Sequence, residues 1–183
     1  MRMERRTLLS LLAVTPVAAQ TATPDPAPTS IPEQRTKAPR FFSEQQYQLL
    51  RELCQLIIPA EENGVGAIEA GTPEYIDLLT SENRDYQREI PGGLLWTDAY
   101  CQDHYGKGFL ACEDRERREV LDRIAFRENA SQQPELWPGV QFFARLRSLT
   151  LDAYFTSPAG VAYLDFRGNS PQSEFTGCPP APK

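Results

Sequence analysis

Residues 43–59 read SEQQYQLLRELCQLIIP and carry the clearest structural signal in this chain. Ser43 followed three residues later by Gln46 is a capping-box pattern, and Phe42 before it can serve as a hydrophobic staple. Apolar residues then recur at helical spacing until Pro59 ends the helix: Tyr47, Leu50, Leu53, Cys54 and Ile57. We predict a helix over residues 44–58 whose apolar stripe is buried in a folded domain.

The chain that follows is also helical in its patterning. Thr72 as N-cap with Pro73 at the first helical position predicts a helix over 73–84, and Asp114 can cap another over 114–128. Apolar periodicity predicts two more, over 92–105 and 138–155, the last ended by Ser157 and Pro158. Because the alternation typical of strands is almost absent, we expect an all-α fold, a compact irregular domain of four to six helices.

The first nineteen residues have the pattern of a bacterial export signal. Arg5 and Arg6 precede an apolar run over residues 8–19, which ends in the small-residue cleavage pattern Val17-Ala18-Ala19. The paired arginines favour the twin-arginine route, with Sec export as the alternative, and predict a periplasmic protein. The run is shorter than the roughly 20 residues that span a bilayer, so we expect cleavage rather than an uncleaved membrane anchor.

Composition divides the remainder into three parts. Residues 20–40 are rich in proline and are predicted to be an extended linker, residues 41–170 form the helical domain, and residues 171–183 are a Pro-rich tail. The chain of 183 residues has 25 acidic and 19 basic side chains and a formal charge of −6. An acidic surface repels phosphate, which excludes nucleic acid as a partner.

Four cysteines in an exported protein predict disulfides, because the periplasm is oxidising. Cys101 and Cys112 flank a short Gly-containing segment that can fold back, and Cys54 is the third cysteine of the helical domain. We expect one or two internal bridges, one of them between two of these three, while Cys178 either closes the tail onto the domain or bonds a second chain. A zinc site is the competing interpretation, but no C-x-x-C or His pair supports it.

The sequence offers little chemistry of its own. His104 is the sole histidine, and a lone histidine acts as a general base only beside a substrate and an orienting group. The acidic loop over residues 59–71 suggests calcium through Glu61, Glu62, Asn63 and Glu69, but its spacing fails the EF-hand pattern. A G-x-G-x-x-G fingerprint is missing. We therefore predict no catalytic, cofactor-binding or metal-binding residue, and expect His104 to be structural.

Aromatic residues gather near the C-terminus in a segment broken by glycine and proline. Such side chains pack either in the core or against another protein, and the sequence favours neither use. The candidate contact residues for a partner are Tyr154, Phe155, Tyr163, Phe166, Phe175 and Cys178.

Several of these stretches together resemble a known family. They are the paired arginines at the start, Leu56-Ile57-Ile58-Pro59-Ala60-Glu61, the glycine-rich residues 64–71, Pro73-Glu74-Tyr75-Ile76-Asp77, Thr156-Ser157-Pro158-Ala159-Gly160, Leu164-Asp165-Phe166, Gly168-Asn169, Phe175 and Gly177-Cys178-Pro179. The chain is similar to the small subunit, subunit 3, of membrane-associated gluconate 2-dehydrogenase and related flavin-dependent sugar dehydrogenases.

The resemblance implies a helical accessory subunit without catalytic residues of its own. Its partner would be a larger flavoprotein of the glucose-methanol-choline type, which carries FAD, and in related complexes a cytochrome c subunit takes the electrons and anchors the assembly to the membrane. The small subunit would act as an escort, whose signal leads the folded partner through the export machinery. Two alternatives remain, a free-standing periplasmic enzyme or binding protein that uses the acidic loop and His104, and a structural envelope protein.

Overall fold

The computed structural model describes residues 38–61, 64–166 and 168, and the named elements within them are all helices. The helices, given with their bounds, are α1 (Glu44–Ile57), α2 (Thr72–Glu82), α3 (Tyr86–Tyr105), the 3-10 turn η1 (Phe109–Ala111), α4 (Asp114–Ala125), α5 (Arg127–Gln132), the 3-10 turn η2 (Pro134–Leu136), α6 (Trp137–Thr156) and α7 (Pro158–Tyr163). The all-α prediction is confirmed. The export signal with Arg5 and Arg6, and the tail with Phe175 and Cys178, lie outside the described residues.

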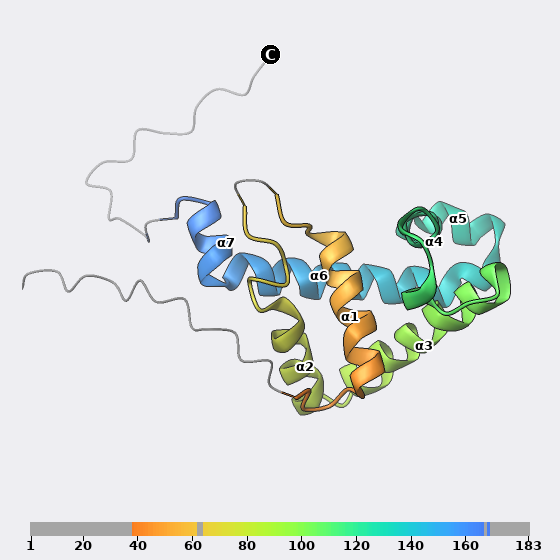
Figure 1. Cartoon of the computed structure of the whole chain (residues 1–183), viewed down its shortest axis with the longest axis horizontal. Coiled ribbons are helices and arrows are strands. Elements are labelled where there is room, and N and C mark those ends of the chain that lie inside the picture. The colour runs from red at the N-terminus through yellow and green to blue at the C-terminus, as the bar shows by residue number, and fades with distance from the viewer. Residues whose placement is uncertain (1–37, 62–63, 167, 169–183) are drawn as a thin grey trace, which may run out of the picture. The chain divides into compact units, whose positions relative to one another are not determined.

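Helix α6 is the centre of the domain. Figure 1 shows it running behind α1, with α2 and α3 on one side, α4 and α5 near one end and α7 at the other, and each of these helices contacts it. Leu146, near the middle of α6, is fully buried. None of the helices in the described part of the chain combines the length and apolar character that crossing a bilayer requires.

Helix α1 forms as its sequence predicts. The Ser43 side chain accepts the Gln46 N–H at 3.3 Å, and the Gln46 side chain accepts the Ser43 N–H at 3.1 Å, which completes the capping box. Leu50, Leu53 and Cys54 have no exposed surface, so the predicted apolar stripe faces the core. The helix ends one residue earlier than predicted.

Helices α3 and α6 approach closely because each offers a glycine to an aromatic ring of the other. A Cβ on Gly93 of α3 would overlap the Phe142 ring of α6, and a Cβ on Gly139 of α6 would overlap the indole of Trp96 on α3. Glycine permits close approach of backbones, and close-packed side chains contribute dispersion energy. These two contacts between a ring and a glycine therefore hold the first half of α6 against α3.

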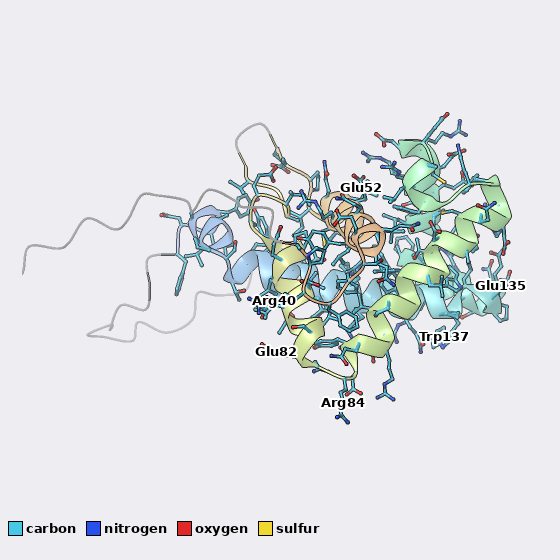
Figure 2. All side chains as sticks on the ribbon, turned by 60° about the horizontal axis from the view of Figure 1, so that its bottom comes forward. Arg40, Glu52, Glu82, Arg84, Glu135 and Trp137 are labelled. Atoms are coloured by element: carbon cyan, nitrogen blue, oxygen red, sulfur yellow. The ribbon has the colours of Figure 1, made fainter. Side chains whose placement is uncertain are left out.

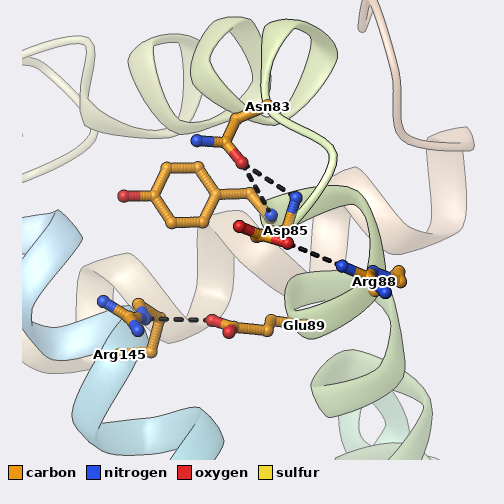
Figure 3. A network of polar contacts seen from close by, with 6 residues as sticks. Asn83, Asp85, Arg88, Glu89 and Arg145 are labelled. Carbon is orange, nitrogen blue, oxygen red and sulfur yellow. Dashed lines mark hydrogen bonds and ion pairs between the residues drawn. The ribbon is translucent and has the colours of Figure 1, made fainter.

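Helix α3 begins six residues before the predicted start at residue 92, because a local turn nucleates it. The Asn83 side chain accepts the N–H groups of Asp85 at 2.8 Å and Tyr86 at 3.3 Å, as Figure 3 shows. Pro91, which lacks an N–H, lies inside the helix and does not end it. The neighbouring Ile90 is fully buried and supports this turn by packing.

Two predicted caps are wrong in detail. The N-cap of α2 is Gly71, whose φ of 76° suits glycine, while Thr72 is the first helical residue and its buried hydroxyl has no hydrogen-bond partner among the described residues. The N-cap of α4 is Glu113 rather than Asp114, and the Glu113 N–H donates to the Glu116 carboxylate at 2.7 Å. The predicted helix over 114–128 breaks at the extended Phe126, so α4 and α5 are separate.

A buried carboxylate on α2 holds the chain that precedes α1. Asp77, which is 4% exposed, accepts the backbone N–H groups of Arg40 at 2.6 Å, Phe41 at 3.0 Å and Phe42 at 3.2 Å. Figure 2 shows Arg40 beside α2. Hydrogen bonds to a charged acceptor are about twice as strong as neutral ones, so this contact fixes where the chain enters the domain.

Candidate partner interface

Exposed apolar side chains concentrate where α6 gives way to α7. We call this surface the apolar end and define it by six residues with more than a third of their surface exposed: Val65, Leu151, Phe155, Tyr163, Leu164 and Phe166. Exposed apolar groups that stand together typically mark a site of interaction with another macromolecule. The predicted contact residues Phe155 and Tyr163 line one cavity there, and Phe166 is exposed a few residues further along the chain.

A hydrogen-bonded junction at Ser157 creates this surface by turning α7 away from the line of α6. The Ser157 hydroxyl donates to the Tyr154 carbonyl at 2.6 Å and accepts the Gly160 N–H at 3.1 Å, which caps α7. Gly160 lies against the backbone of Tyr154, where a Cβ would clash with the carbonyl. The sequence analysis ended the helix at this point but did not predict α7.

The apolar end surrounds a small cavity of about 130 Å³. Leu151, Phe155 and Tyr163 line one part of it, and Ile58, Pro59 and Val65 from the loop after α1 line another. Cofactor and substrate pockets usually measure about 300–1,000 Å³, so this cavity is the size of a site for one protein side chain. Pockets of this kind hold the anchor residues that dominate protein–protein affinity.

Tyr154 lines the same cavity but lies beneath the surface of the apolar end. The sequence analysis placed it among the contact residues, whereas its side chain is only 5% exposed. Its hydroxyl donates to the Val65 carbonyl at 2.8 Å, and its ring stands edge-on to Phe155 with centroids 5.2 Å apart. Tyr154 therefore positions the loop and the neighbouring ring, because a buried tyrosine needs a partner for its hydroxyl.

Val65, Leu151 and Leu164 were not among the contact residues predicted from the sequence. The signal for Leu151 was its position, since the buried residues Leu146, Leu149, Thr150 and Ala153 follow helical spacing and Leu151 falls between them. No local sequence pattern identifies Val65. Its loop is held in place by a hydrogen bond from the hydroxyl of Tyr154, a residue far along the chain, to the Val65 carbonyl.

A second cavity, of about 720 Å³, lies between α3 and α6. It is lined in part by the interlocked Gly93 and Phe142 and by Glu89 and Arg145, whose side chains form an ion pair at 3.0 Å. Figure 3 shows this pair joining the two helices. Glu89 and Arg145 neutralise one another at that edge, and Arg127 is a third charged residue of the lining.

His104 and the acidic loop are engaged in local structure. The Nδ1 atom of His104 is 2.9 Å from the Tyr100 carbonyl, and the two rings stack with centroids 3.9 Å apart at the end of α3. In the loop, the Glu69 carboxylate accepts the Gly66 N–H at 3.1 Å, while Glu62 and Asn63 lie outside the described residues. Across residues 38–61, 64–166 and 168, no group of three His, Cys, Asp or Glu side chains could hold a metal ion.

The three described cysteines are buried and present as free thiols. The Cys54 Sγ is 3.7 Å from the Thr150 hydroxyl of α6, whereas the thiols of Cys101 and Cys112 are close enough to interact electrostatically with one another. Burial raises the pKa of both Cys54 and Cys101 to about 12, so both are protonated at neutral pH. The predicted internal disulfides stay a prediction, and Cys178 lies outside the described residues.

Comparison with known proteins gives one match. Searches of curated proteins and of solved structures found nothing similar to this chain. The family model described as gluconate 2-dehydrogenase subunit 3 matches residues 44–172, from the start of α1 to beyond α7. That match covers the whole helical domain and most of the chain, and we conclude that the chain belongs to the gluconate 2-dehydrogenase subunit 3 family.

Proposed function

We propose that this chain is the non-catalytic small subunit of a periplasmic, FAD-dependent sugar or polyol dehydrogenase. Its direct partner is the large catalytic subunit, a flavoprotein of the glucose-methanol-choline type, and a cytochrome c subunit can complete the assembly. The observation that carries this proposal is membership of a family defined as a subunit of gluconate 2-dehydrogenase. Contact with a membrane is then indirect, through the complex.

The apolar end supports a role in assembly. A cavity of about 130 Å³ rimmed by the aromatic rings of Phe155 and Tyr163 suits one apolar anchor residue of the large subunit. Such anchors supply most of the affinity of an interface when they are fully desolvated. Residues 156–166, which carry α7, also belong to the part of the sequence that resembles the family.

The structural engagement of the reactive side chains supports a role without catalysis. His104 contacts the backbone of its own helix, and Cys54 is buried beside a threonine with its thiol protonated. A general base or nucleophile needs access to a substrate and an activating neighbour. Hydride transfer from the sugar therefore belongs to the FAD of the large subunit.

The export signal supports a second part of the role. The twin-arginine route carries folded proteins, and a small domain without a cofactor gains little from it on its own. We propose that Arg5 and Arg6 direct export of the folded, flavin-loaded large subunit bound to this chain. The two arginines then direct the export of both subunits, although only the small subunit carries them.

Copurification tests the interface. The chain is co-expressed with an affinity-tagged large subunit, either unchanged or as the double variant Phe155→Asp/Tyr163→Asp. We expect the variant to lose at least about tenfold in recovered complex, because charges would enter a desolvated contact. Leu95→Asp is the matched control, since Leu95 on α3 is 70% exposed and Tyr163 is 65% exposed. Equal recovery of all three proteins would contradict the assigned surface.

Export needs a separate measurement. Arg5→Lys/Arg6→Lys should abolish flavin-dependent dehydrogenase activity in the periplasm while the complex still forms in the cytoplasm. If periplasmic activity of the large subunit stays the same without this chain, the escort role is wrong, even if the two subunits bind.

A further inference from the structure

Cys101 and Cys112 meet where the chain turns back after α3. Cys101 is in the last turns of α3 and has no exposed surface, and Cys112, which follows η1 directly, is 4% exposed. The Cys112 thiol donates to the Lys107 carbonyl at 3.9 Å, and the Cys101 thiol is close enough to Cys112 for the two groups to interact electrostatically.

The segment between the two cysteines is held at both ends. Gly106 ends α3 with a φ of 70°, and the Phe109 N–H donates to the Asp98 carboxylate at 2.9 Å. The Lys107 ammonium pairs with Glu116 of α4 at 2.8 Å. The bond from Phe109 to Asp98, which lies one helical turn before Cys101, brings the segment that ends in Cys112 against the same face of α3.

We propose that Cys101 and Cys112 form an intramolecular disulfide, which staples the C-terminal end of α3 to the segment leading into α4. This goes beyond the proposed function, because it concerns the covalent state of this chain and holds with or without a partner. Cys54 is not part of the pair, since its sulfur faces the Thr150 hydroxyl.

The bond forms by exchange with a second disulfide, such as oxidised glutathione or the oxidised dithiol of a thiol oxidoreductase. The Cys112 thiolate attacks one sulfur of that disulfide, and the other leaves as a thiolate. Deprotonated Cys101 then attacks the Cys112 sulfur of the mixed disulfide and releases the second thiolate. The pair loses two electrons and two protons, and the oxidant becomes two thiols.

Burial of the Cys101 thiol determines when the disulfide can form. The attacking species is the thiolate, and burial raises the pKa of Cys101 to about 12. Exchange in the closed domain is therefore slow, and it proceeds while the segment is open, during folding or local unfolding. A chain that folds before export carries the dithiol across the membrane and acquires the bond in the periplasm.

Peptide mapping tests the assignment directly. The full-length protein is equilibrated in a glutathione redox buffer with enough denaturant for partial opening, refolded, then fully unfolded in guanidinium with N-ethylmaleimide at mildly acidic pH, and digested with trypsin without reduction. Cleavage after Arg88, Lys107 and Arg115 separates the two cysteines into residues 89–107 and 108–115. We expect these peptides to be joined, with a mass two hydrogen atoms below their sum, and the Cys54 peptide, residues 52–84, to be alkylated.

Thermal unfolding gives an independent readout. The oxidised protein should melt about 5–10 °C above the reduced protein, because the bond restricts the unfolded chain. Cys101→Ala and Cys112→Ala should lose this redox dependence, and Cys54→Ala should keep it. The proposal is overturned if residues 89–107 and 108–115 are separate and alkylated in oxidising buffer, or if either is joined to another cysteine peptide.

Discussion

Helix α6 has two stretches that differ in how far their apolar side chains are buried. Over residues 139–150, Gly139, Phe142 and Leu146 are packed against α3 and the core, and Thr150 contacts Cys54 of α1. From Leu151 onward, the same helix and α7 leave large apolar groups exposed. The first stretch serves the stability of the domain and the second is available to a partner, so substitutions should separate stability from binding.

The largest expected contrast is between two truncations on α6. Leu146→Ala should lower the free energy of unfolding by about 2–5 kcal/mol, because it leaves a cavity at a fully buried site. Phe155→Ala, at a side chain that is 39% exposed, should cost less than about 1 kcal/mol. Urea unfolding of both variants measures the contrast, and equal costs would show that the apolar end is part of the core.

Two adjacent glycines on α3 give a sharper test of the interlocked stretch. Gly93→Ala should destabilise the domain by about 1–3 kcal/mol, because the new methyl group overlaps the Phe142 ring. Gly92→Ala is the control: nothing lies within 4 Å of its added methyl group, and alanine favours a helix by up to about 1 kcal/mol. If the denaturation midpoint shifted in the same direction for both variants, this packing would be contradicted.

The buried thiol on α1 gives the core stretch a dependence on pH. Burial raises the pKa of Cys54 from 9.0 to about 12, so between these values the unfolded chain releases a proton that the folded domain keeps. The free energy of unfolding should therefore fall as pH rises, by about 1.4 kcal/mol per pH unit from this group. Under reducing conditions, Cys54→Ala should show a shallower alkaline slope than the unchanged protein, and parallel slopes would refute the shift.

The smallest expected effect concerns the boundary between the stretches. Tyr154→Phe removes the hydrogen bond to the Val65 carbonyl and should cost about 0.5–1.5 kcal/mol. Hydrogen exchange at residues 64–66 should become faster, because the loop loses its tie to α6. Tyr163→Phe, at an exposed ring, serves as the control and should leave both measurements within about 0.5 kcal/mol of the unchanged protein.

Local signals predicted the fold well. The capping box at Ser43 and Gln46 and the spacing from Tyr47 to Ile57 placed α1 to within one residue, because these interactions join residues three or four apart. The start of α3 was missed because Pro91-Gly92-Gly93 suggests a break, although Asn83 carried the signal for the actual turn. At Thr72, the tight turn at Gly71 took the cap position that the threonine was expected to fill.

The candidate interface was only partly predictable, because it depends on contacts between distant residues. The aromatic composition near the C-terminus identified Phe155, Tyr163 and Phe166, but Tyr154 in the same run is buried by its bond to Val65. Alternation of buried and exposed neighbours is visible in sequence only when the helix face is known. The state of the cysteines likewise depends on which helices bring them together.

The carboxylate of Asp77 determines where the folded domain starts along the chain. A shortened chain beginning at residue 43 would retain the whole capping box, yet it would leave a buried charge without the three N–H groups that solvate it. A chain beginning at residue 38 would keep all three. A residue of the second helix therefore sets how much chain before α1 the folded domain needs, and Arg40 makes the earliest of these three hydrogen bonds.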